Sequence, residues 1–214
     1  MNARNSIHLY YVLDPMCSWC WGFRPVFQRL LETLPIRTTV QYVMGGLAPD
    51  SDQPMTEATR QYVQKMWRAV EKHTGAKFNY DFWKYCHPRR STYPACRAII
   101  ASGLQKHSAI PDMIFAIQKA YYLQSLNPSN LDILIRLSEE IGLDGQRFEN
   151  DITSKDVETL LQQDFQLRRD LGVMSFPSVI MESNNNTQWL ANGYLPIEDI
   201  IKKIPNDILK AYQD

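Results

Sequence analysis

The stretch from Ile7 to Phe23 reads IHLYYVL, then DPM, then CSWCWGF. Its first seven residues are apolar, aromatic and rich in β formers, which predicts a buried strand. Asp14-Pro15 ends this strand, because the proline ring fixes φ and removes a hydrogen-bond donor. Apolar residues then recur at helical spacing, at Val26, Phe27, Leu30, Leu31 and Leu34. The pattern therefore predicts two cysteines, Cys17 and Cys20, at the start of a helix that follows a buried strand.

This position has consequences for the two thiols. A helix N-terminus exposes unpaired N–H groups and a partial positive charge, which stabilise a thiolate, and the thiolate is the form that attacks a disulfide. We expect Cys17 to be the attacking thiol and Cys20, lying deeper, to be the resolving thiol. The alternatives are half a zinc site or two inert core cysteines. A zinc site needs a second close pair, and Cys86 and Cys96 are too far apart in the sequence, so no metal is expected.

Charge and hydropathy exclude several classes of partner. The 214 residues contain 23 Lys and Arg against 23 Asp and Glu, so no global field favours nucleic acid or an anionic membrane. Residues 1–6 are polar, the apolar run 7–13 is short for a signal sequence, and no stretch approaches the roughly 20 apolar residues that span a bilayer. The sequence predicts a cytoplasmic protein, in which a CxxC pair is more often catalytic than structural.

The chain begins as β-α-β and then becomes helical. Residues 37–44 are typical of a second strand, which favours a parallel pair with the helix as crossover. No segment from Thr56 to Gly142 alternates as a strand does, and helices are expected to start near Pro54, Ser91, Pro111 and Pro128. The first of these helices has an apolar stripe that is expected to pack in the core. The stripe consists of Tyr62, Val63, Met66, Trp67 and Val70.

Strands return near the end of the chain. A helix is expected over 154–171, a strand after Pro177, a turn at 184–186, a returning strand over 187–191 and a last helix from Pro196. The sequence therefore predicts an α/β fold with two parts. Residues 1–50 and 152–214 are expected to form a thioredoxin-like sheet domain. Residues 51–151 are expected to form an all-helical insertion.

Without the helical block, the element order resembles the thioredoxin fold. The insertion between the second strand and the following helix resembles the DsbA family, and the chain is most similar to its cytoplasmic FrnE-like branch of predicted disulfide isomerases or oxidoreductases. That branch carries an Asp ahead of Cys-x-Trp-Cys, matched here by Asp14 and residues 17–20. The resemblance covers nearly the whole chain, and its specific motifs are residues 14–23 and 172–178.

The resemblance implies further site residues. Phe176-Pro177 is expected to be a cis peptide that faces the cysteines, with the backbone of Phe176 free to pair with an extended substrate; an ordinary trans proline before an edge strand is the alternative. Ser18 and Trp19 are expected to contact substrate together with Phe176, although Ser18 stands where the branch often has Pro. Asp14 either relays a proton to the second cysteine or caps the helix.

The sequence thus predicts a thiol-disulfide oxidoreductase, a reductase or isomerase of protein disulfides that forms a mixed disulfide at Cys17 and resolves it with Cys20. Its expected partners are thiol- or disulfide-containing proteins and a cytosolic thiol reductant. No cofactor is expected beyond the cysteine pair, with glutathione as an optional co-substrate. The alternatives are a kappa-class-like glutathione transferase or isomerase, which uses Ser for the first cysteine, and a non-enzymatic thioredoxin-fold binding module. Retention of both cysteines argues against each.

Two further features have open interpretations. Arg89-Arg90 form a basic patch that either faces the active-site groove or lies in solvent. Cys86 and Cys96 are either a second redox pair or two separate thiols of the helical block. The dipeptide Ser18-Trp19 between the two cysteines does not decide whether the protein acts as an oxidant or as a reductant. The sequence does not predict the oligomeric state.

Overall fold

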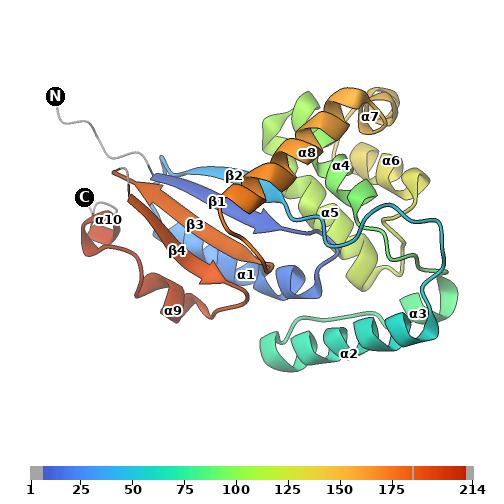
Figure 1. Ribbon diagram of the computed structural model, residues 1–214, viewed down its shortest axis with the longest axis horizontal. Helices are drawn as coiled ribbons and strands as arrows, with labels where there is room; N and C mark the ends of the chain where they lie inside the picture. Colours follow the sequence, from blue (N-terminus) through green and yellow to red (C-terminus); the bar gives the residue numbers. More distant parts are fainter. Residues whose placement is uncertain (1–6, 185, 211–214) are drawn as a thin grey trace.

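The computed structural model describes residues 7–184 and 186–210, and within these residues it has the predicted α/β architecture. Four strands form one sheet in the order β2-β1-β3-β4 (Figure 1). β1 pairs in parallel with β2 and antiparallel with β3, and β3 pairs antiparallel with β4. The strand bounds are β1 Ile7–Leu13, β2 Thr39–Met44, β3 Ser178–Ser183 and β4 Asn186–Asn192.

Helices cover both faces of the sheet, which explains why β1 is apolar along its length. Leu9, Tyr11 and Leu13 share a core with α1 and α9 on one face. Val12 lies on the opposite face, in a smaller cluster with side chains of α8. The covering helices are α1 Ser18–Thr33, α8 Lys155–Asp170 and α9 Ile197–Ile201.

The helices between β2 and α8 gather beyond the carboxyl end of β1, as Figure 1 shows. Thr56 caps the first of them, since its Oγ1 accepts a hydrogen bond from the N–H of Thr59, and Gly75 ends it with a φ of 74°. In the described part of the chain this block adds no strand to the sheet. Its elements are α2 Glu57–Thr74, α3 Phe82–Tyr85, α4 Tyr93–Gln105, the 3₁₀ turn His107–Ala109, α5 Ile110–Leu123, α6 Leu131–Glu140 and α7 Gly145–Ile152.

Some elements differ from the sequence-based expectations. The short helices α3 and α7 are not anticipated by the apolar pattern. The expected single last helix is divided at Pro205 into α9 and α10, which spans Asn206–Lys210, because proline removes a donor and clashes with the preceding turn. Tyr62 does not join the core as its stripe predicts, for 57% of its surface is exposed.

The two predicted domains share one continuous core. Its buried members include Leu9 and Phe23 near the N-terminus and Trp67, Phe82 and Tyr122 in the helical block. The division at residues 51 and 151 therefore stays a prediction. Parts of the predicted sheet domain and its turn lie outside the described residues, namely 1–6, 185 and 211–214.

A glycine sets the contact between α1 and α2. A Cβ at Gly22 would lie 2.9 Å from both Thr74 Oγ1 and Val70 Cγ1 of α2, which is closer than such atoms approach. Thr74 has little freedom to move, because its hydroxyl donates a 2.8 Å hydrogen bond to the Val70 carbonyl. The absence of a side chain at Gly22 lets α2 pack directly against the helix that begins at the cysteines.

Candidate active site

The two cysteines lie where β1 passes into α1. Cys17 is the N-cap residue of α1, with extended backbone angles, and its N–H donates to the Asp14 carbonyl at 3.0 Å. The helix then begins with a 3.1 Å hydrogen bond from the Trp21 N–H to the Cys17 carbonyl. Cys17 keeps 8% of its surface exposed, whereas Cys20 is 0% exposed. The order of exposure matches the expected roles of attacking and resolving thiol.

The pKa values of the two thiols are shifted in opposite directions. A hydrogen bond from the Cys20 thiol lowers the pKa of Cys17, with help from the backbone at Cys20 and Trp19, while burial works against it. Burial raises the pKa of Cys20 well above its ordinary value, and the adjacent Cys17 sulfur raises it further. These shifts favour the thiolate form at Cys17 and the protonated form at Cys20.

The loop before β3 closes over the first sulfur. The Phe176-Pro177 peptide bond is cis, and Cys17 Sγ lies 3.8 Å from the Phe176 carbonyl oxygen. The Phe176 ring is only partly buried and packs on Gly45, where an added Cβ would lie 2.6 Å from the ring. Pro177 is buried and leads directly into β3.

Asp14 is a fully buried carboxylate beneath the pair. Its Oδ1 accepts from the Met16 N–H at 2.9 Å, and its Oδ2 accepts from the Leu47 N–H at 2.7 Å and from Thr92 Oγ1 at 2.6 Å. Burial raises its pKa, although these three hydrogen bonds and the charge of Arg90 lower it in part. The helix-capping interpretation is wrong, because Cys17 occupies the N-cap and the Met16 N–H precedes the helix.

A cleft of about 160 Å³ opens beside Cys17. Arg90 lines it, whereas Arg89 turns away and donates to the Ser129 carbonyl and to Asn130 Oδ1. The basic patch of the sequence is therefore divided between a site residue and a structural one. The other walls of the cleft are Met16, Ser18, Trp19, Leu47, Tyr62, Val63, Met66 and Trp67.

The residues between the cysteines have different surroundings. Ser18 is buried at the floor of the cleft. Trp19 is half-buried, with ring centroids 5.7 Å from His73 of α2 and 6.0 Å from Tyr194, which follows β4. Trp19 therefore joins three separate segments at the rim of the site.

Several cleft residues escaped the sequence reasoning. Tyr62 and Met66 are assigned there to a core stripe, yet they face the cleft from α2. Their spacing is that of an ordinary amphipathic helix, so the pattern alone carries no sign of this role. Leu47 follows the end of β2 in a loop with no apolar period. In the sequence, only the preceding Gly45-Gly46 indicates a close approach there.

The remaining cysteines lie in different environments. Cys86 Sγ donates to the Ser125 carbonyl at 2.9 Å in a partly exposed position. Cys96 is fully buried, with its Sγ 3.8 Å from Asp14 Oδ2. Burial raises the pKa of Cys96 well above its ordinary value, and the Asp14 charge raises it further. A buried thiol with a raised pKa is a poor nucleophile, which favours a packing role for Cys96 over a redox role.

No helix among residues 7–184 and 186–210 combines the length and the apolar character needed to cross a membrane. Curated relatives include two proteins named ClpXP adapter protein SpxH. That of Halalkalibacterium halodurans is 24% identical over 186 residues, and that of Bacillus subtilis is 22% identical over 180 residues. The matches cover 85% and 83% of this chain but only 60% and 59% of the relatives. The chain thus spans about three fifths of the length of these relatives.

Solved structures match over nearly the whole chain. A protein titled "putative protein disulfide isomerase" from Nitrosomonas europaea is 27% identical, with a TM-score of 0.82 over 97% of this chain and 98% of that one. The cytosolic disulfide reductase DsbM from Pseudomonas aeruginosa is 22% identical, with a TM-score of 0.75 over 96% and 97% of the two chains. The profile of the family described as Thioredoxin matches residues 10–200. The chain therefore belongs to the thioredoxin family and has the DsbA-like form of its fold.

Proposed function

We propose that this protein is a thiol-disulfide oxidoreductase that reduces or isomerises protein disulfides. The Cys17 thiolate attacks one sulfur of a substrate disulfide, forming a mixed disulfide and releasing the other sulfur as a thiolate that takes a proton. In reduction, Cys20 then loses its proton and attacks the Cys17 sulfur. This step releases the second substrate thiol and leaves a Cys17–Cys20 disulfide. In isomerisation, a second substrate thiol displaces Cys17 instead.

The observation that carries the proposal is a pair of thiols in which Cys17 lines a cleft and has a lowered pKa, while its neighbour Cys20 is buried and has a raised pKa. A low pKa favours the attacking thiolate at Cys17, and a protonated Cys20 does not compete for substrate before the mixed disulfide forms. The partly exposed Phe176 and its carbonyl next to Cys17 supply a backbone group for an extended substrate, with Pro177 fixing the turn and Ser18 and Trp19 lining the cleft.

Asp14 is proposed as the group that takes the proton of Cys20 in the second step. Its burial and raised pKa suit a carboxylate that holds a proton briefly. The direct donors from Thr92 and Leu47 keep the carboxylate in place. Asp14 thus acts after substrate capture, and its loss should slow release rather than attack.

The reductant that restores the dithiol is proposed to be a cytosolic thiol such as glutathione. The structural relative DsbM is titled as cytosolic and has also been solved with GSH. In this chain, Arg90 places a positive charge in the cleft that contains Cys17, and glutathione carries carboxylates that such a group binds.

The test is trapping of the mixed disulfide with a disulfide-bonded protein such as insulin. Cys20→Ser should retain attack and accumulate a covalent complex through Cys17, whereas Cys17→Ser should form no complex and lose turnover. Both cysteines are replaced by the same residue, so the pair is a matched control. Turnover that survives Cys17→Ser, or an unreactive Cys20→Ser variant that is folded, would remove the proposal.

An adapter role is the second candidate, because the two curated relatives described above are named ClpXP adapters. The exposed apolar side chains of Tyr62 and Leu47, which both line the cleft, offer a surface for a protein partner. The double variant Cys17→Ser/Cys20→Ser distinguishes the two functions. An adapter keeps delivering its client to the protease without the thiols, while an oxidoreductase loses its effect on the client.

A further inference from the structure

A second cavity, which shares no lining residue with the cleft beside Cys17, opens between α1, α5 and the strands β1 and β2. Its volume is about 200 Å³, several times the roughly 30 Å³ that a water molecule occupies in the liquid. Well-packed interiors contain few voids larger than a water molecule. The cavity is therefore large enough for a ligand of about ten non-hydrogen atoms.

Aromatic rings form one side of this cavity. Tyr11 of β1 stacks on Phe27 of α1 with ring centroids 4.0 Å apart and planes 26° apart. Tyr42 of β2 meets Phe27 edge to face at 6.2 Å. Ile114 of α5 also lines the cavity. Such a lining suits a planar ring, because aromatic groups prefer offset and edge contacts with other rings.

Two polar side chains at the cavity, one buried and one partly exposed, have few hydrogen-bond partners of their own. Gln118 of α5 is 1% exposed, and its Oε1 has no hydrogen-bond partner among the described residues. Arg24 of α1 is held over the Phe115 ring, 3.9 Å from its centroid. Its one hydrogen bond in the described part of the chain is a 3.4 Å contact with Gln28 Oε1, and no carboxylate there pairs with it.

We propose that this cavity binds a small aromatic carboxylic acid that also carries a hydroxyl or amino group. The ring lies against the aromatic side, the carboxylate pairs with Arg24, and the donor group hydrogen-bonds to Gln118 Oε1. The guanidinium supplies the strongest class of hydrogen bond to a carboxylate. An apolar cavity with a few convergent polar groups is the usual form of a small-molecule site.

The site adjoins the redox pair through one residue. Burial raises the pKa of Tyr11 well above its ordinary value, and the sulfurs of Cys20 and Cys17 raise it further. Tyr11 lines the cavity and belongs to the same core cluster as both cysteines. The proposed binding requires no disulfide exchange, so it can be measured on the reduced protein with no substrate present.

The experiment titrates the reduced protein with 4-hydroxybenzoate and follows the methyl resonances of Ile114. We expect saturation with a Kd on the order of 0.1–1 mM for a ligand of this size. Benzoate lacks the donor and phenol lacks the carboxylate, so each should bind about tenfold more weakly. The 2- and 3-hydroxy isomers show which separation of the two groups the cavity accepts.

Variants locate the binding. Arg24→Gln and Gln118→Leu should each weaken binding about tenfold. Arg29→Gln removes the same charge from an exposed position of α1 and should leave binding unchanged. Arg24 is partly exposed, so Arg24→Gln is expected to fold. This variant keeps the test valid if Gln118→Leu, a change in the core, does not fold. The proposal is overturned if no hydroxybenzoate saturates the Ile114 signal at ligand concentrations up to about tenfold above the expected Kd range. It is also overturned if Arg24→Gln and Arg29→Gln bind alike, or if phenol binds as well as the acid.

Discussion

One neighbour lowers the pKa of the Cys17 thiol more than any other group does. The hydrogen bond from the Cys20 thiol is the largest influence that lowers its pKa. Cys20→Ser keeps a donor at that point, and Cys20→Ala removes it. We expect the Cys17 pKa to lie below the free value of about 8.5 in Cys20→Ser and to be higher in Cys20→Ala. Thiolate absorbance against pH measures both, and equal values in the two variants would contradict the assigned cause.

Thr92 is the buried donor that supports Asp14. Its hydroxyl donates to Asp14 Oδ2 at 2.6 Å and accepts from the Ala48 N–H at 3.1 Å. Thr92→Val keeps the shape, but it leaves the Ala48 N–H without its acceptor and removes one of the hydrogen bonds to Asp14 Oδ2. The free energy of unfolding should therefore fall by about 1–3 kcal/mol. Urea denaturation measures this loss. Thr92→Ser retains the hydroxyl and is the control; if it is destabilised as much as Thr92→Val, the hydrogen bonds are not the cause.

Arg90 should favour anionic substrates. Its charge lies in the cleft with Cys17, so Arg90→Gln should lower kcat/KM for glutathione disulfide by roughly threefold to tenfold. The cationic disulfide cystamine should lose nothing. Arg68→Gln is the matched control, because Arg68 lies on α2 away from this cleft and stacks over Tyr80. A parallel loss for both disulfides would show that Arg90 acts on the fold and not on substrate charge.

At the level of elements, the sequence predicts what depends on local pattern. The strand, the proline and the helical spacing place Cys17 and Cys20 correctly, because each signal lies within a few residues of the next. The partners of Asp14 at Leu47 and Thr92 come from loops distant in sequence, and no periodicity reports such contacts. Arg90 and Arg89 are adjacent in a loop, where side-chain direction follows no repeat, so their separate roles also needed the structure.

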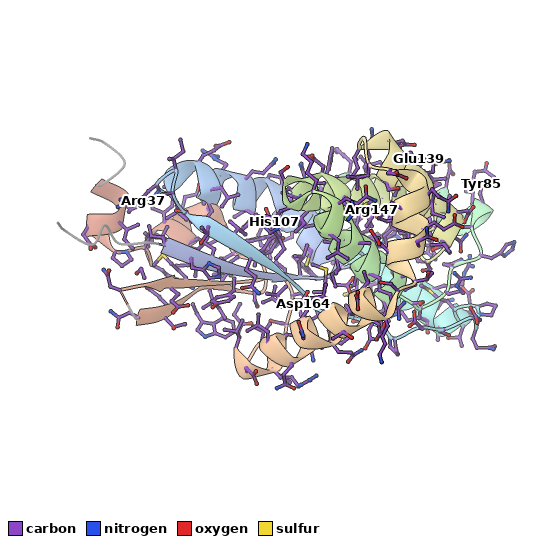
Figure 2. The ribbon with its side chains drawn as sticks, turned by 90° about the horizontal axis from the view of Figure 1, so that it is seen from above. Arg37, Tyr85, His107, Glu139, Arg147 and Asp164 are labelled. Atoms are coloured by element: carbon purple, nitrogen blue, oxygen red, sulfur yellow. The ribbon has the colours of Figure 1, made fainter. Side chains whose placement is uncertain are left out.

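The junction of α8 with β2 contains a carboxylate that titrates near neutrality. Asp164 of α8 accepts a 3.0 Å hydrogen bond from the Met44 N–H at the end of β2, and Figure 2 labels it between α8 and the strands. Burial raises its pKa from 3.8 to about 6. The folded state therefore binds the proton more tightly than the unfolded state does. Protonation of Asp164 therefore stabilises the folded state. This contribution to the free energy of unfolding is complete below pH 3.8 and is lost as pH rises through about 6.

Asp164→Asn should remove this pH dependence. A shift of about two units corresponds to at most about 3 kcal/mol, so the wild type should lose up to that amount, relative to the variant, between pH 4 and pH 7. The amide oxygen of Asn still accepts from the Met44 N–H, so the junction is kept. Urea denaturation at several pH values measures the difference. Parallel stability profiles for the two proteins would contradict a buried, titrating carboxylate.

For the whole molecule, one core joins the sheet and the helical block. Trp21 of α1 stacks on Tyr122 of α5, with ring centroids 5.6 Å apart, and Tyr93 of α4 packs against Phe165 of α8. We expect both parts to open in one cooperative step. Hydrogen exchange in rising urea should give β1 and α5 the same largest opening free energy. A block that opens well before β1 would instead support the predicted division into two folding units.

The contact at Gly22 has a consequence for the protein's mutational landscape. Every other amino acid there adds a Cβ that meets Val70 and Thr74, so the position should be as intolerant as either cysteine. A selection that scores only survival would rank Gly22 with the nucleophile, although it touches no reacting atom. Cellular abundance separates the two kinds of loss. Variants of Cys17 leave a normal amount of inactive protein, whereas variants of Gly22 leave too little protein to detect.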